Sequence, residues 1–288
     1  MAVWIAIALG VVQGVFMFLP VSSTAHLVLT QHWLIQLGYD LPPPESAEMV
    51  LFDLVVHVGT LVSILVVFRR SLWKLSLGVL RDTGHWLSDG GRIRRELLFL
   101  RLSFLCAFSL LVTAVIGFSF RHWFNLVFAN PLSVAGTLTV TGILLWLTDR
   151  LSRRPLGLRR INLRIAGIIG LAQGLALIPG LSRSGMTITF ALFSGMKRKW
   201  AAEYSFFLAI PTILAASAVQ SLEVLLDGGL RQLSGTVMAV GFVVAALVGI
   251  VALKLVLVLL YRARLKYFSF YLWALAAAVG FGFISPGY

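Results

Sequence analysis

The chain has few charged residues and a single cysteine, and each shortage excludes a class of protein or of cross-link. Only 12% of the 288 residues are charged, whereas 59% are hydrophobic. A soluble domain carries about 25% charged residues, so this chain lacks the polar surface needed to cover a soluble globule. Its one cysteine, Cys106, excludes an intrachain disulfide. The composition therefore predicts a membrane protein.

The first 68 residues contain no lysine or arginine, although the whole chain has 24 of them and only 11 acidic residues. Twenty of the basic residues fall in four clusters, which are Arg69 to Arg101, Arg150 to Arg164, Lys197 to Lys199 and Arg262 to Lys266. Each cluster adjoins an apolar run, which is typical of cytoplasmic loops under the positive-inside rule. Nucleic-acid binding is the weaker interpretation of the net charge of +13, because no soluble basic domain is present to carry it.

Six apolar runs have the length of a transmembrane helix, about 20 residues. They are residues 49–68, 102–119, 131–148, 203–222, 234–260 and 268–287. Two further apolar regions, 1–36 and 164–196, are interrupted by Pro, Gly and Ser clusters. Such breaks are tolerated at membrane depth only where protein or a wet cavity covers the loose backbone. We therefore predict an all-α polytopic membrane protein with six transmembrane helices and two re-entrant helical hairpins.

The basic clusters set the orientation of these segments. With Asp40, Glu45 and Glu48 placed outside, the spans bring all four basic clusters to the inside. The first hairpin then enters from outside and the second from inside. Residues 70–100 are predicted to form an amphipathic stretch on the inner leaflet, with a flexible basic loop as the alternative for residues 82–92.

The two interrupted regions also resemble each other. Residues 13–24 read QGVFMFLPVSST, and residues 173–184 read QGLALIPGLSRS. Similar halves of opposite orientation indicate an inverted repeat, whose site lies where the broken helices meet near the membrane midplane. We predict a single membrane domain over residues 1–288, with repeat halves at about 1–148 and 149–288.

Arg183 lies inside the second hairpin, where a guanidinium is expensive and rare. Its neighbours Ser182, Ser184 and Thr187 supply hydroxyl groups beside an open backbone at a helix start. This combination of a bidentate donor, hydroxyls and free amides suits a phosphate group. The structural alternative is an arginine that only satisfies carbonyl groups of the hairpin turn.

The first hairpin supplies Ser22, Ser23 and His26 directly after its break at Pro20. His26 follows Ser23 by three residues, so both side chains share one face of a helix. A hydroxyl nucleophile beside an imidazole acid or base is suited to phosphoryl transfer. A cap for the next helix and a hydrogen-bonded core histidine are the structural alternatives.

Asp53 and His57 are four residues apart in the span that begins near residue 49. This spacing places them on one helix face. Asp53 is a candidate for binding a cation or for orienting a histidine, and a position in the outer interface is the alternative.

These residues lie in segments that resemble the undecaprenyl-diphosphate phosphatases of the bacitracin-resistance type. Residues 10–27, GVVQGVFMFLPVSSTAHL, are similar to the first motif of that family. Residues 175–196, LALIPGLSRSGMTITFALFSGM, are similar to its second motif, the PGxSRSxxT signature. Residues 52–61 and 203–213 also resemble family segments at the expected places, so the resemblance spans nearly the whole chain.

The resemblance implies an integral phosphatase of the bacterial inner membrane, which hydrolyses undecaprenyl diphosphate to the monophosphate at the outer face. It implies a divalent cation, Mg²⁺ or Ca²⁺, and a role in recycling the lipid carrier of cell-wall synthesis. Carried over by position, Ser22, Ser23, His26 and Arg183 are the catalytic candidates. The substrate-binding candidates are Gln13, Asp53, Ser182, Ser184 and Thr187. Gln13 and Asp53 are also the candidate cation ligands.

Met17 departs from the family pattern. Gln13 matches the first position of the acidic (E/Q)xxxE element, but Met17 replaces the glutamate of its second position. A thioether does not bind Mg²⁺ or Ca²⁺, because these hard cations prefer oxygen ligands. Two alternatives to a phosphatase therefore stay open, a polyprenyl-phosphate transporter or flippase and a catalytically inactive lipid-binding relative. The expected partners are a polyprenyl diphosphate lipid, membrane lipids and a second copy of the chain in a homodimer.

Overall fold

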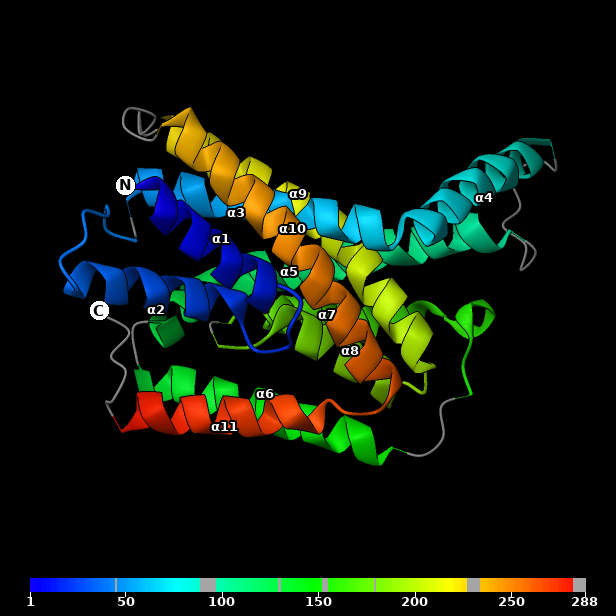
Figure 1. Cartoon of the computed structure of the whole chain (residues 1–288). Helices are drawn as coiled ribbons and strands as arrows, with labels where there is room; N and C mark the ends of the chain where they lie inside the picture. Colours follow the sequence, from blue (N-terminus) through cyan, green and yellow to red (C-terminus); the bar gives the residue numbers. More distant parts are fainter. Residues whose placement is uncertain are drawn as a thin grey trace.

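The computed structural model describes residues 1–44, 46–88, 97–128, 131–151, 155–178, 180–226 and 234–281. These residues form eleven α-helices and one 3-10 helix (Figure 1). In chain order the elements are α1 (Val3–Phe16), α2 (Ser23–Gln36), α3 (Ala47–Val67), α4 (Arg69–Ser88), α5 (Leu98–Phe128), α6 (Pro131–Arg150), η1 (Leu158–Arg160), α7 (Leu163–Leu175), α8 (Arg183–Phe193), α9 (Arg198–Leu226), α10 (Gly235–Tyr261) and α11 (Lys266–Gly280).

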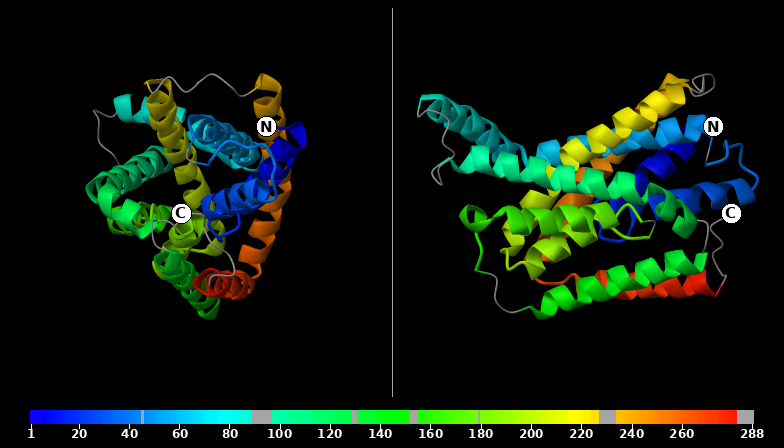
Figure 2. Two further views of the ribbon diagram at one scale, coloured as in Figure 1. Left: turned by 90° about the vertical axis from the view of Figure 1, so that its left-hand side faces the viewer. Right: turned by 180° about the vertical axis from the view of Figure 1, so that it is seen from behind.

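Five of the described helices are long and apolar enough to cross a membrane. They are α3, α5 within Leu98–Phe120, α6 within Leu132–Arg150, α9 within Arg198–Leu222, and α10. The chain is therefore a polytopic helical membrane protein, as its composition predicts. The sixth predicted span, 268–287, is the shorter helix α11, which ends at Gly280 with Phe281 as its C-cap and is not one of these five. Figures 1 and 2 show this helix, α11, side by side with α6 along one edge of the bundle.

Both interrupted regions fold into two short helices joined by a turn. The first region gives α1 and α2, with 14 residues each, and the second gives α7 and α8, with 13 and 11 residues. At 1.5 Å per residue even the longest of these helices measures about 21 Å, less than the roughly 30 Å hydrocarbon core of a bilayer. Neither pair is therefore built like two complete spans, and the break that the sequence indicates in each is confirmed.

Helix α10 lies between α1 and α3 and packs along both. The contact with α3 is so close that a Cβ atom on Gly59 would come within 2.6 Å of the carbonyl oxygen of Phe242. The Ser63 hydroxyl of α3 donates a hydrogen bond to the Ala246 carbonyl of α10 at 2.8 Å. On the other side of the bundle, α7 packs along α5. Small residues thus bring whole helices together where large side chains would hold them apart.

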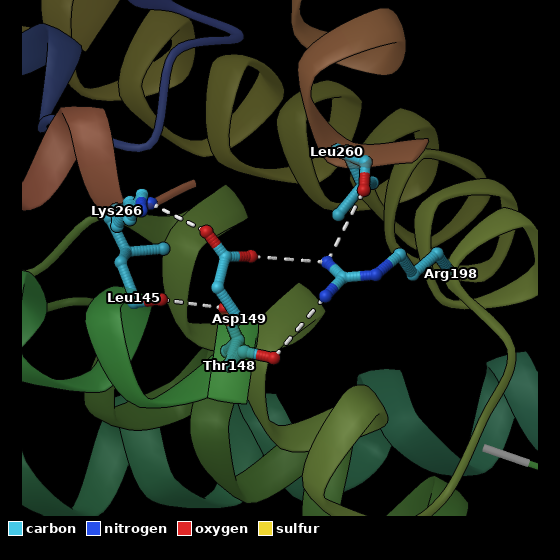
Figure 3. A network of polar contacts seen from close by, with 6 residues as sticks. All are labelled: Leu145, Thr148, Asp149, Arg198, Leu260 and Lys266. Carbon is cyan, nitrogen blue, oxygen red and sulfur yellow. Dashed lines mark hydrogen bonds and ion pairs between the residues drawn. The ribbon is translucent and has the colours of Figure 1, made fainter. Parts of the chain in front are cut away.

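One end of the bundle gathers the basic clusters. Figure 3 shows Asp149 at the end of α6 between Arg198 at the start of α9 and the backbone of Lys266 at the start of α11. Asp149 accepts from the Lys266 amide at 2.8 Å and forms an ion pair with Arg198 at 3.4 Å. Arg198 also donates to the carbonyls of Thr148 and Leu260, which belong to the last turns of α6 and α10. A single arginine thus satisfies carbonyls of two helix ends.

Helix α4 extends this basic end. It runs on from α3 and projects beyond the rest of the bundle, with its far half packed on the start of α5 (Figure 1). The Asp82 carboxylate accepts from the backbone amides of Phe99 and Leu100 and so caps α5. Residues 82–88 are helical, so the loop alternative is wrong there, and residues 89–92 lie outside the described part.

Candidate active site

A cavity of about 370 Å³ lies where the turns of both interrupted regions meet α3 and α9. We call it the hydroxyl cavity. The candidate residues that line it are Ser22, Ser23, Asp53, Ser182, Arg183 and Ser184, joined by Met17 and His57. Residues that are 160 positions apart in the sequence therefore face one space. The remaining candidates, Gln13, His26 and Thr187, lie behind its wall and are described below.

The second turn is built to start a helix at the cavity. Gly180 has a φ of +86°, in the left-handed region that favours glycine. Ser182 then caps α8, because its Oγ accepts a hydrogen bond from the Gly185 amide at 3.2 Å. The Ser184 hydroxyl lies 3.4 Å from the Ser182 hydroxyl. Two hydroxyls and the positive end of a helix thus lie next to each other at the cavity.

Arg183 is the first residue of α8 and lines the same cavity. Its Nη1 atom is buried and has no hydrogen-bond partner among the described residues. Thr187 holds the backbone of Arg183 from behind, because its hydroxyl donates to the Arg183 carbonyl at 2.9 Å. Thr187 is fully buried against Ser205 of α9. Thr187 therefore supports the arginine rather than lining the cavity itself.

The first turn has a different backbone. Ser22, the residue before α2, has φ 68° and ψ 85°, a conformation that L-residues other than glycine rarely adopt. Its hydroxyl does not cap α2, which rules out the simple capping role considered from the sequence. The first amide groups of α2 are therefore left without a side-chain cap beside the cavity. Strain of this kind is typical of functional turns.

His26 supports this strained turn. Its Nδ1 lies 2.8 Å from the Ser22 carbonyl, and its Nε2 lies 2.6 Å from the hydroxyl of Tyr271 on α11. A carbonyl only accepts, so Nδ1 carries the hydrogen, and in the neutral ring Nε2 accepts from Tyr271. The ring also stacks on Phe16 with 3.9 Å between centroids. Both nitrogens are thus engaged, and neither is paired with the Ser23 hydroxyl.

Met17 occupies the position between the amide of Gln13 and the hydroxyl of Ser23. Its sulfur lies 3.5 Å from Gln13 Nε2 and 3.8 Å from Ser23 Oγ. The side chain is only 7% exposed, and Gln13 is completely buried with its Oε1 unpaired among the described residues. A thioether is a weak acceptor, so these contacts hold both polar groups only loosely.

Gln173 occupies the matching position in the second region and has stronger partners. Its Nε2 donates to the hydroxyls of Thr212 on α9 at 3.0 Å and of Thr113 on α5 at 3.2 Å. The two glutamines therefore differ in what they contact, although both begin the segment that leads to a turn.

Asp53 and His57 share one face of α3 and line the cavity, as their spacing predicts. One carboxylate oxygen of Asp53 accepts from Gln31 Nε2 of α2 at 2.9 Å. The Nδ1 of His57 lies 2.7 Å from the Asp53 carbonyl, so the neutral ring presents Nε2 as its acceptor. His57 and Arg183 line the same cavity. An imidazole therefore faces the cavity, but it is His57 and not His26.

The cavity does not fit a divalent cation well. Mg²⁺ is held by one or two carboxylates together with substrate phosphates, and Ca²⁺ takes six to eight oxygen ligands. Among the described residues no group of three or more His, Cys, Asp or Glu side chains is placed to hold a metal. Asp53 is the one carboxylate in the lining, and Gln31 already engages one of its oxygens. The oxygen that position 17 could supply is replaced by sulfur.

Sequence reasoning missed two supporting residues. Tyr271 contacts His26 across 245 residues, and Gln31 binds Asp53 from another helix. Both partnerships depend on tertiary packing. The only local signal is a polar side chain within an apolar helix, which by itself names no partner.

The comparison with known families matches the region that builds this cavity. The family model described as bacitracin resistance protein BacA matches residues 6–278. The chain belongs to this BacA family. It is 63% identical to the undecaprenyl-diphosphatase of Alkalilimnicola ehrlichii, over 99% of this chain and 98% of the relative. It is 58% identical to that of Halorhodospira halophila, over 99% of both chains.

More distant BacA relatives align over nearly the same length. The undecaprenyl-diphosphatase of Carboxydothermus hydrogenoformans is 35% identical over 95% of both chains. The family resemblance seen in the two motifs is thus confirmed over the complete arrangement of helices.

Proposed function

We propose that this chain hydrolyses undecaprenyl diphosphate to undecaprenyl phosphate and phosphate, and so recycles the lipid carrier of cell-wall synthesis. The observation that carries the proposal is the buried, unpartnered Nη1 of Arg183 in a cavity lined by serine hydroxyls. A buried cationic donor without a partner is costly. An anionic phosphate group supplies the missing acceptor.

Residues of the second turn bind the substrate. Arg183 donates two parallel hydrogen bonds to the terminal phosphate, a geometry that a guanidinium favours. Ser182 and Ser184 add hydroxyl contacts, and Thr187 fixes the backbone of Arg183. The N-termini of α2 and α8 both begin at the cavity and favour negative charge there. Gln13 supports the first turn through Met17.

The chemical step falls to the first turn. The hydroxyl of Ser22 or Ser23 attacks the terminal phosphorus, and the bond from phosphorus to the bridging oxygen breaks. Undecaprenyl phosphate leaves with the bridging oxygen, and water then cleaves the phosphoserine to release phosphate and restore the hydroxyl. His57 takes the serine proton at Nε2, Asp53 supports His57 through its carbonyl, and His26 acts by holding Ser22 in its strained conformation.

The lipid tail has an apolar place beside the hydroxyl cavity. A second cavity of about 210 Å³ shares Ser22, Leu177 and Leu181 with the first, and is otherwise lined mainly by aliphatic side chains of α2, α6 and α11. A diphosphate in the polar cavity thus has an apolar neighbour for the first isoprene units. This adjacency favours a lipid substrate over a soluble diphosphate.

The arrangement in the membrane follows from charge and repeat. The basic end of the bundle faces the cytoplasm of a bacterial plasma membrane under the positive-inside rule. Glycines 160 residues apart support the inverted repeat, because Gly10 of α1 abuts the backbone of α10 and Gly170 of α7 abuts the backbone of α5. The two turns then enter from opposite faces, and the active site opens to the outer face.

Phosphate release from undecaprenyl diphosphate tests the proposal. The purified protein in detergent is assayed with added Mg²⁺ or Ca²⁺ and with chelator. Release above that of the Arg183→Ala variant is the expected result. A transporter or an inactive lipid-binding relative releases none under any of these conditions, although it still binds the lipid.

A further inference from the structure

A third cavity lies at the basic end of the bundle and has no part in the proposed reaction. It measures about 770 Å³ and lies between α4, α5, η1 and α9. We call it the basic cavity. It reaches along α9 from Lys199 to Pro211, about 18 Å of helix. Its deep end lies near the hydroxyl cavity. Pro211 lines the basic cavity, and Thr212, which follows it on α9, lines the hydroxyl cavity.

The two ends of the basic cavity differ in chemistry. Four cationic side chains line its mouth, those of Lys74, Arg159, Arg160 and Lys199. The one carboxylate in the lining, Glu203, is 7% exposed and lies one helical turn from Lys199 on α9. Deeper in, the walls are aliphatic and aromatic, with Leu102, Leu110 and Phe207 among them. A cationic mouth above an apolar interior matches an amphiphile with an anionic head.

Hydrogen bonds to the rest of the bundle fix the backbone that carries these cationic side chains. Arg101 of α5 donates to the Arg159 carbonyl at 3.2 Å and to the Ile161 carbonyl, which fixes the η1 segment. Leu156 pairs through its backbone with Gly195 and Lys197 beside the start of α9. The cations on η1 and α9 are thus presented by backbone that is tied to the bundle. Such preorganisation reduces the cost of binding.

The cavity is not a gap that the fold requires. Under the proposed repeat, α5 and α9 correspond to α10 and α3, and that second pair is closed by the contact of Gly59 with Phe242. In contrast, the basic cavity lies between α5 and α9, which share a hydrogen bond of 2.8 Å between Ser109 and Tyr204. Protein interiors are close-packed, so an apolar space of this size among the described residues favours an occupant.

We propose that the basic cavity binds a lipid with an anionic phosphate headgroup. The phosphate lies among Lys74, Arg159, Arg160 and Lys199, and the chain lies along α9 toward Pro211. This chemistry has two sources in the membrane, an anionic phospholipid and a polyprenyl monophosphate. The proposal does not depend on the phosphatase activity, because none of its residues touches the hydroxyl cavity.

Cys106 provides a local probe, since it is the only cysteine of the chain and lines the basic cavity. The protein is placed in phosphatidylcholine nanodiscs, and its modification by N-ethylmaleimide is followed by mass spectrometry. Dioleoyl phosphatidylglycerol and undecaprenyl phosphate are added in separate arms. At ten times the Kd only about one-tenth of the protein is free, so modification is expected to slow about tenfold. Native mass spectrometry measures the Kd directly and decides between the two sources.

A matched pair of variants tests where the head binds. The double variant Lys74→Gln/Lys199→Gln is expected to raise the Kd roughly 25-fold, at about fivefold for each lysine. Arg69→Gln/Arg70→Gln removes the same charge from exposed positions at the start of α4 and leaves the Kd within about twofold. Equal weakening by both pairs, protection by phosphatidylcholine alone, or no binding of either anionic lipid overturns the proposal.

Discussion

The turns of the two interrupted regions face the same cavity but are built by opposite means. The second turn is stabilised by residues close to it in the sequence. Gly180 adopts the positive φ of the turn, Ser182 caps α8, and Thr187 binds the backbone of Arg183. The first turn depends on distant partners, because its strained Ser22 is held by His26, which is held in turn by Tyr271. One turn carries a buried cation, and the other carries no charge at all.

This difference separates binding from chemistry. A rigid, locally determined turn with a charged group suits recognition of the terminal phosphate of the substrate. A strained turn with hydroxyls suits an attacking group, whose position must be exact and is therefore fixed from several sides. We expect changes in the second turn to act mainly on substrate binding, and changes around the first turn to act mainly on kcat.

Arg183→Ala is expected to have the largest effect, a loss of about 10²- to 10³-fold in kcat/KM. The side chain pairs with the substrate rather than with the scaffold, so the thermal unfolding midpoint should change little. Arg183→Lys keeps the charge but loses the bidentate geometry, and should recover activity only in part. If Arg183→Ala unfolds at much lower temperature while the surviving protein still binds the lipid, the arginine is a scaffold residue.

His57→Gln should lower kcat about 10²-fold, the scale of one general base. Because the imidazole acts on the proton rather than on the phosphate, KM is expected to stay within a few-fold. The acidic limb of the pH profile of kcat should also disappear. An unchanged pH profile in His57→Gln would assign the proton transfer to another group.

Met17→Glu tests the missing charge of the first turn. The added carboxylate lies next to Gln13 and Ser23, where it can reach a cation that bridges diphosphate oxygens. We expect turnover to gain a dependence on Mg²⁺ or Ca²⁺ and to rise by at least about tenfold, or about 1.4 kcal/mol of barrier. A buried carboxylate without a cation is costly, so this variant should melt lower in chelator than in excess cation.

The alternative hypothesis is that Asp53 already binds the cation in the unaltered chain. That alternative requires robust cation-dependent turnover in the unaltered chain and its loss in Asp53→Asn. Our proposal requires weak cation dependence in the unaltered chain. The two expectations are opposite in the same assay, so one measurement of turnover against Mg²⁺ concentration decides between them.

Tyr271→Phe is expected to have the smallest effect, about a fivefold loss in kcat with little change in KM. It removes one hydrogen bond to His26, worth about 1 kcal/mol. Tyr267→Phe, on an exposed position of the same helix, is the matched control and should be neutral. A change in KM instead of kcat would place Tyr271 on the binding side of the comparison.

The groups that the second turn brings to the cavity could be predicted from the sequence, since they belong to adjacent residues. Ser182, Arg183 and Ser184 line the cavity that their chemistry suggests. The first turn could be predicted only in its residue types. Helical spacing places Ser23 and His26 on one side, but the hydrogen bonds of His26 run to Ser22 and Tyr271. A ring nitrogen takes the best available partner, and Tyr271 is brought there by packing that no local pattern encodes.

The helices could be predicted more directly from the sequence than the hydrogen bonds of the first turn. The hydrophobic runs placed five spans correctly because burial in lipid selects apolar residues directly. Residues 82–88 remain helical despite Gly84, in agreement with the amphipathic stretch predicted for residues 70–100 and against the loop alternative. Packing against α5 and the cap that Asp82 gives that helix outweigh the low helix propensity of glycine there.

Two buried hydroxyl groups of α5, those of Ser109 and Thr113, fix its close contact with α7. Thr113 gives its only hydroxyl proton to the carbonyls of Ser109 and Gly170, and the Ser109 hydroxyl gives its proton to the Ala166 carbonyl at 2.8 Å. Ala166 and Gly170 lie one turn apart on α7, as Ser109 and Thr113 do on α5, so these two hydrogen bonds set the register in which the two helices pack.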